Sequence, residues 1–95
     1  MKSVKLFYLT HCPYCVKAKQ AIAELHVENP EYEKVQIERI NEEEHPEIAK
    51  QFDYYYVPTI FFGDEKLYEA QPGQNYEEIK DCIRKAFDSV LENIG

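Results

Sequence analysis

Two cysteines, Cys12 and Cys15, stand where a predicted strand gives way to a predicted helix. The residues before them, Val4–Leu9, are mostly β-branched, aliphatic or aromatic, which is typical of a largely buried strand. The residues after them repeat apolar side chains at helical spacing. Pro13 suits the first position of that helix, because its fixed φ is helical and its missing N–H would have no partner there. We therefore place both thiols on the first turn of a helix that follows a strand.

The rest of the chain continues this alternation of strands and helices. The predicted elements after the first helix are a strand over 34–40, a turn and short helix over 41–52, strands over 58–62 and 66–70, and a last helix that begins near Asn75. The strand over 34–40 alternates strictly, which predicts one buried face. Residues 63–65 read as a hairpin turn. The order β-α-β-α-β-β-α predicts an α/β fold, a four-stranded mixed sheet with helices on both faces.

Length and charge restrict the organisation and the partners. The 95 residues predict a single domain over 1–95. The net charge of −7 disfavours binding to nucleic acids and to anionic membranes. No stretch approaches the roughly 20 apolar residues that cross a bilayer, and the N-terminus lacks a signal-peptide core. Three cysteines, of which two are close in sequence, are unlike a secreted disulfide scaffold. We expect a cytoplasmic monomer.

The position of the two cysteines predicts thiol chemistry. Unpaired N–H groups and the helix dipole stabilise negative charge at a helix N-terminus, which favours the thiolate of Cys12. A thiolate attacks a disulfide sulfur and forms a mixed disulfide. Cys15, on the inner face of the helix, then attacks Cys12 and releases the reduced product. Lys17 and His11 are candidates to support the thiolate, since the first 23 residues carry four lysines and no acidic residue.

Other interpretations of the Cys-x-x-Cys spacing remain open. The spacing is half of a zinc site, but the other half is missing, because Cys82 and the three histidines form no second pair. The remaining alternatives are an iron–sulfur cluster held between two chains, a structural disulfide, and a thioredoxin-like module without catalysis. Redox chemistry is the interpretation that the spacing and its position favour, and we expect no bound metal.

Two motifs resemble a known family. Residues 12–15 read Cys-Pro-Tyr-Cys and are followed by Ala18-Lys19, which resembles the active-site motif of dithiol glutaredoxins. Residues 56–59 read Tyr-Val-Pro-Thr at the start of a strand and resemble the cis-proline loop of the thioredoxin superfamily. The element order fits as well, so the resemblance covers nearly the whole chain. It implies a thioredoxin-like fold and a thiol–disulfide oxidoreductase.

The resemblance also implies roles for single residues. Cys12 would be the nucleophile that becomes glutathionylated, and Cys15 the resolving thiol. Tyr14 would flank a glutathione groove. Val57 would offer its backbone N–H and C=O to glutathione, and Pro58 would be cis and lie against the dithiol, with Pro13 supporting the motif. Glutathione would be a co-substrate rather than a bound cofactor, and disulfide-containing proteins would be substrates.

The sequence departs from glutaredoxins at three places and from thioredoxins at one. Tyr56, which would line the groove, stands where glutaredoxins usually have Thr. Residues 68–71 read Tyr-Glu-Ala-Gln in place of the Gly-Gly and acidic residues that hold glutathione. Leu9 replaces a basic residue, and Leu6 replaces the buried aspartate of thioredoxins. Two hypotheses therefore stand: recycling by glutathione, or recycling by a dedicated reductase as in thioredoxins.

Overall fold

The computed structural model describes residues 3–94. Its elements are β1 (Val4–Tyr8), α1 (Pro13–Glu28), a 3₁₀ turn η1 (Pro30–Lys34), β2 (Ile37–Asn41), α2 (Pro46–Ala49), β3 (Thr59–Phe62), β4 (Glu65–Glu69) and α3 (Tyr76–Ile94). The predicted order of strands and α-helices is confirmed. Among these residues, no helix is both long enough and apolar enough to span a membrane.

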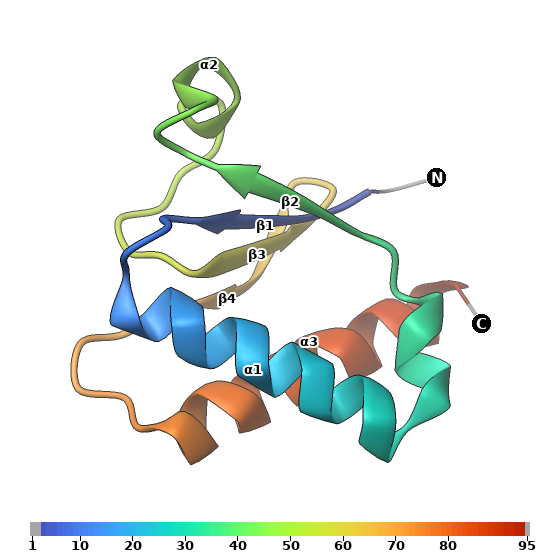
Figure 1. Cartoon of the computed structure of the whole chain (residues 1–95). Helices are drawn as coiled ribbons and strands as arrows, with labels where there is room; N and C mark the ends of the chain where they lie inside the picture. Colours follow the sequence, from blue (N-terminus) through green and yellow to red (C-terminus); the bar gives the residue numbers. More distant parts are fainter. Residues whose placement is uncertain (1–2, 95) are drawn as a thin grey trace.

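The four strands form one mixed sheet in the order β2-β1-β3-β4. Strand β1 pairs in parallel with β2, to which helix α1 connects it, and antiparallel with β3 on its other side. Strand β4 returns antiparallel to β3 through a turn in which Gly63 has a φ of 61°. This is the predicted thioredoxin-like α/β arrangement, and it places the end of β1 at the centre of the sheet (Figure 1).

Helices cover both faces of the sheet, as the sequence predicts (Figure 1). Helices α1 and α3 pack side by side on one face over the larger core, in which Ile22, Leu25, Ile83 and Phe87 are almost completely buried. The short helix α2 lies on the other face over a smaller cluster centred on Phe7. Strand β1 takes part in both cores, because its side chains alternate between the two faces.

Helix α3 begins where the sequence predicts. The side chain of Asn75 accepts a hydrogen bond from the Glu78 N–H at 2.9 Å. The Glu78 carboxylate accepts one in return from the Asn75 N–H at 3.0 Å. This reciprocal capping satisfies two of the N–H groups that a helix start leaves unpaired.

The predicted strand over 34–40 is wrong at its start. Residues Pro30–Lys34 form a 3₁₀ turn, and β2 begins only at Ile37. Tyr32 in this turn is buried, and its hydroxyl donates to the Asp88 carboxylate of α3 at 2.8 Å. The prediction of a single buried face also fails, since Ile37 packs with the larger core and Ile40 with the smaller one.

Candidate active site

Cys12 lies at the start of helix α1, where the chain leaves the centre of the sheet. It is the N-cap residue, with extended backbone angles of φ −85° and ψ 122°, and Pro13 follows as the first helical residue. Its carbonyl accepts the first helical hydrogen bond, from Val16 N–H at 3.0 Å. The half-buried thiol points across to the neighbouring loop, with its Sγ 3.7 Å from the carbonyl oxygen of Val57. Cys12 therefore has the location that the sequence predicts, beside unpaired helical N–H groups.

Cys15 lies one turn further along, on the buried side of α1. It is 8% exposed, and its Sγ accepts a hydrogen bond from Leu9 N–H at 3.4 Å. Burial raises the pKa of the Cys15 thiol to about 12, the Leu9 N–H opposes the shift, and the adjacent Cys12 adds to it. Both cysteines are free thiols. The site thus combines an accessible thiol at the helix N-terminus with a buried thiol that stays protonated at neutral pH.

The loop before β3 completes the site. The Val57–Pro58 peptide bond is cis, which confirms the prediction made from the resemblance. Pro58 is buried and lines the same pocket as Cys15. The hydroxyl of Thr59, itself fully buried, donates to the carbonyl of Tyr56 and ties the loop to the first residue of β3.

A carboxylate that sequence reasoning did not single out holds this loop from the other side. Oε2 of Glu69, at the end of β4, accepts hydrogen bonds from the N–H of Tyr55 at 2.5 Å and of Tyr56 at 2.8 Å. Its Oε1 pairs with the ammonium of Lys66 at 2.8 Å. Burial alone would raise the pKa of Glu69, but Lys66 and the two N–H groups outweigh it, so this pKa lies below its ordinary value. Glu69 is thus ionised, and it holds in place the two residues that precede Val57.

Replacing Glu69 with Gln is expected to loosen this loop. Loss of the charge weakens two hydrogen bonds and one ion pair, which should lower the free energy of unfolding by about 1 kcal/mol. Because the folded pKa of Glu69 is below the unfolded one, its contribution is complete above about pH 4.3 and is lost as the pH falls through the folded value. Urea denaturation should show a difference between wild type and Glu69→Gln at pH 7 that shrinks as the pH falls below about 4.3. Glu65→Gln, an exposed acid on the same strand, is the control; an equal effect of both variants would contradict the role of Glu69.

The other predicted site residues take separate positions. The hydroxyl of Tyr14 accepts a hydrogen bond from Gly73 N–H at 2.8 Å, which ties α1 to the turn before α3. The ammonium of Lys17 lies 5.8 Å from the centre of the Tyr14 ring. His11 is exposed in the turn before Cys12. The structure therefore brings Cys12, Cys15 and the cis-proline loop together, and it directs Lys17 toward Tyr14.

Exposed aromatic side chains border the site. Tyr55 is 86% exposed and Tyr56 47% exposed, although their backbone is fixed by Glu69. Large exposed rings offer apolar contact area to a peptide or tripeptide. Within residues 3–94, no three His, Cys, Asp or Glu side chains gather in an arrangement that could hold a metal ion.

Comparison with known proteins agrees with this geometry. A family model of glutaredoxins matches residues 4–67, a span that contains both cysteines and the cis-proline loop. The chain belongs to the glutaredoxin family. It is a thiol–disulfide oxidoreductase of that family, with a Cys-x-x-Cys pair at a helix start.

Individual relatives point to the wider thioredoxin superfamily. The chain is 30% identical over 82 residues to a thioredoxin of Methanocaldococcus jannaschii, an alignment that covers 86% of this chain and 92% of that protein. Two solved structures share the fold at 17% identity. Thioredoxin 1 of Thermosipho africanus has a TM-score of 0.58 and covers 93% of this chain and 97% of its own. A structure described as that of a malarial protein has a TM-score of 0.59, with coverage of 90% and 96%.

Proposed function

We propose that this glutaredoxin-family chain reduces disulfides and glutathione mixed disulfides through Cys12 and Cys15, and that glutathione recycles it. The observation that carries the proposal is the asymmetry of the two thiols. Cys12 is half-buried at the N-terminus of α1, beside the unpaired N–H groups of the first helical turn, whereas burial keeps Cys15 protonated. Cys12 is therefore suited to attack the substrate disulfide, and Cys15 is suited to remain protonated until the mixed disulfide has formed.

The reaction proceeds by two exchanges. The Cys12 thiolate attacks one sulfur of the substrate disulfide, and the other sulfur leaves as a thiolate and takes up a proton. Cys15 then loses its proton and attacks the Cys12 sulfur, which releases the second substrate thiol and leaves a Cys12–Cys15 disulfide. Two glutathione thiols reduce this disulfide and become glutathione disulfide. When the substrate is a glutathione mixed disulfide, free glutathione attacks glutathionylated Cys12 directly, and Cys15 is not needed.

The loop residues support the substrate in this proposal. The Val57 carbonyl, which faces Cys12 at 3.7 Å, is available to a peptide N–H of the substrate once the Cys12 thiol is engaged. We assign to Tyr14 and to half-exposed Tyr56 the apolar walls of the substrate groove, and buried Pro58, which lines one pocket with Cys15, supports the loop beside the dithiol. Lys17 and His11 contribute positive charge and polarity near the helix start.

A second candidate function is a thioredoxin-like protein-disulfide reductase that a dedicated reductase recycles. Two observations favour it. Glu69 is the last residue of β4, next to the segment where glutaredoxins hold the γ-glutamyl end of glutathione, and its carboxylate already binds the loop N–H groups of Tyr55 and Tyr56. The curated relative at 30% identity is a thioredoxin.

The deciding experiment measures glutathione-driven reduction of a small glutathione mixed disulfide by wild type, Cys15→Ser and Cys12→Ser. We expect Cys15→Ser to retain turnover and Cys12→Ser to lose it by at least about 10³-fold, because only Cys12 forms the mixed disulfide. Cys82→Ser, on α3, is the matched control and should leave turnover unchanged. Absence of glutathione-driven turnover in wild type, with insulin disulfides still reduced by the intact dithiol, would replace the proposal with the second candidate.

A further inference from the structure

A pocket of about 400 Å³ opens beside Cys15, between helix α1 and strands β1 and β2, and Cys12 is not among the residues that line it. Its buried lining residues are Leu6 of β1, Cys15 and Ala18 of α1, and Pro58 of the loop before β3. Its rim carries exposed residues, among them Val16 at 58% exposure. The proposed exchange reactions use the Cys12 side of the dithiol and leave this pocket without a role.

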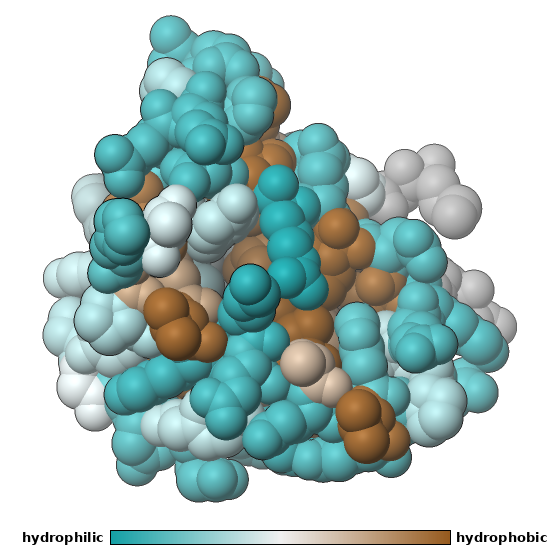
Figure 2. Space-filling model, viewed as in Figure 1, coloured by the Kyte–Doolittle hydropathy of each residue, from teal (hydrophilic) through white to brown (hydrophobic). Residues whose placement is uncertain are grey.

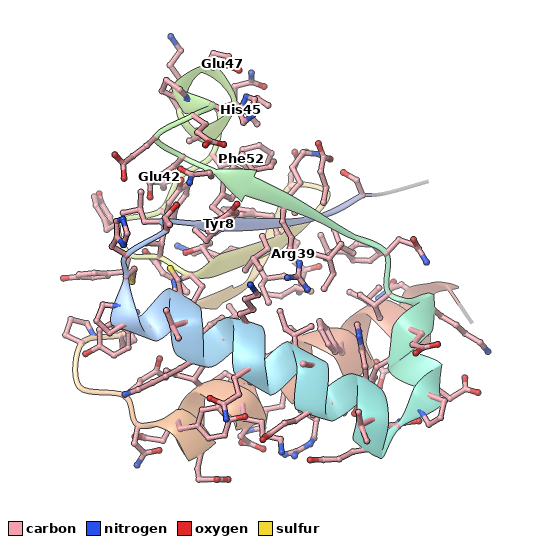
Figure 3. The ribbon with its side chains drawn as sticks, viewed as in Figure 1. Tyr8, Arg39, Glu42, His45, Glu47 and Phe52 are labelled. Atoms are coloured by element: carbon pink, nitrogen blue, oxygen red, sulfur yellow. The ribbon has the colours of Figure 1, made fainter. Side chains whose placement is uncertain are left out.

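Two cations stand at the rim of this pocket. Arg39 extends from β2 into the space between the sheet and α1 (Figure 3), and Lys19 approaches from α1. Neither side chain forms an ion pair with any residue from 3 to 94. The acidic neighbour of Arg39, Glu38, lies on the opposite side of the strand and pairs with Lys5 at 3.5 Å. In a chain of net charge −7, two unpaired cations that line one pocket are a local reversal of the overall charge.

The surface between the sheet and α1 is also apolar. Figure 2 shows hydrophobic surface between the strands and α1, with hydrophilic side chains lying across it. Apolar atoms that line a concave site favour an apolar ligand by roughly 25 cal/mol for each Å² removed from water. A guanidinium adds a planar pair of donors that matches a carboxylate. The lining therefore fits a molecule that is apolar along its length and anionic at one end.

We propose that this pocket binds a small amphipathic carboxylate, with its apolar body against Leu6, Val16 and Ala18 and its carboxylate between Arg39 and Lys19. The charge pattern excludes a cation, and the apolar lining disfavours a fully hydrated ion such as free phosphate. The pocket shares the Cys15 wall with the dithiol, so the ligand would lie against the resolving thiol without contacting Cys12.

The test is titration of sodium octanoate into the ¹⁵N-labelled, reduced protein, followed by backbone amide shifts. We expect saturable shifts at Leu6, Val16 and Arg39, with a dissociation constant in the range of about 1 mM for a ligand of this size. Arg39→Gln should weaken binding about tenfold and Lys19→Gln about threefold, since both cations are partly solvated. Lys34→Gln, an exposed lysine in η1 that already pairs with Glu31, is the matched control and should bind as wild type does.

Several outcomes would overturn the inference. Shifts that gather outside the pocket would place the binding elsewhere. If octan-1-ol binds as tightly as octanoate, or if Arg39→Gln binds octanoate with unchanged affinity, charge has no role in binding. If inorganic phosphate produces equal shifts, the apolar lining has no role. The amide spectrum of each variant reports whether it is folded. The result is independent of the proposed redox function, because binding is measured without turnover.

Discussion

In a variant whose only cysteine is Cys15, iodoacetamide is expected to modify the folded protein about a hundredfold more slowly than the urea-unfolded chain. Burial raises the pKa of this thiol from 9.0 to about 12, so the folded state holds about a thousandfold less thiolate at neutral pH. A more basic thiolate is also more nucleophilic, and this raises the reaction rate by roughly a factor of 20 to 30, which offsets part of the loss. The limited access to a sulfur in a residue only 8% exposed reduces the rate again.

The measurement is the rate of mass increase of the Cys12→Ser, Cys82→Ser variant with and without urea. Removing Cys12 also removes its small contribution to the raised pKa, whereas burial, the largest cause, remains. The folded-state rate should rise about tenfold for each pH unit up to about pH 10, because the thiolate fraction is then far from saturation. Similar rates in folded and unfolded protein would show that Cys15 is not held protonated. This result would contradict its assignment as a resolving thiol that stays protonated until the mixed disulfide forms.

The sequence predicts the parts of the fold that depend on local pattern. Helix α3 is an example, since Asn75 and the apolar repeat after it mark its start and its buried face. The start of β2 is different. The alternation over 34–40 suits a strand, but Tyr32 is drawn into the core beside Phe87, with ring centres 5.5 Å apart, and the chain turns there instead. That contact joins residues far apart in sequence, so no local pattern could predict it.

The candidate active site likewise contains residues that the sequence predicts and one that it does not. Cys12 and Cys15 could be predicted, because their chemistry follows from a helix start that the sequence marks with Pro13. The role of Glu69 could not be predicted, because its carboxylate reaches the Tyr55 and Tyr56 N–H groups only through the pairing of β3 with β4, which is irregular between Ile60 and Phe61. The strand register of an irregular hairpin is set by the whole sheet and not by the turn residues alone.

Replacing Phe7 with Ala is expected to lower the free energy of unfolding by about 3 to 5 kcal/mol. Phe7 is completely buried, and its ring centre lies 5.1 Å from that of Phe52, 5.1 Å from Tyr54 and 6.0 Å from Phe61. Interiors are close-packed, so the residues around the lost ring fill the cavity only in part. For a domain of this length the total stability is about 5 to 14 kcal/mol, and the loss would be a large share of it. Urea denaturation under reducing conditions measures the change, and Phe7→Leu should cost only about 1 kcal/mol.

Because of the location of Phe7, we also expect Phe7→Ala to lower the disulfide-reducing activity. Its cluster supports Tyr54 and Val57, the residues that lead into the cis-proline bond beside Cys12. Phe87→Ala on the opposite face removes a ring of the same size from the core between α1 and α3, far from that loop in the fold. Both variants should therefore lose stability, but at a temperature where both remain folded only Phe7→Ala should also lose disulfide-reducing activity. Equal activity of the two folded variants would show that the loop holds its position without the cluster beneath it, through Glu69 and Thr59 alone.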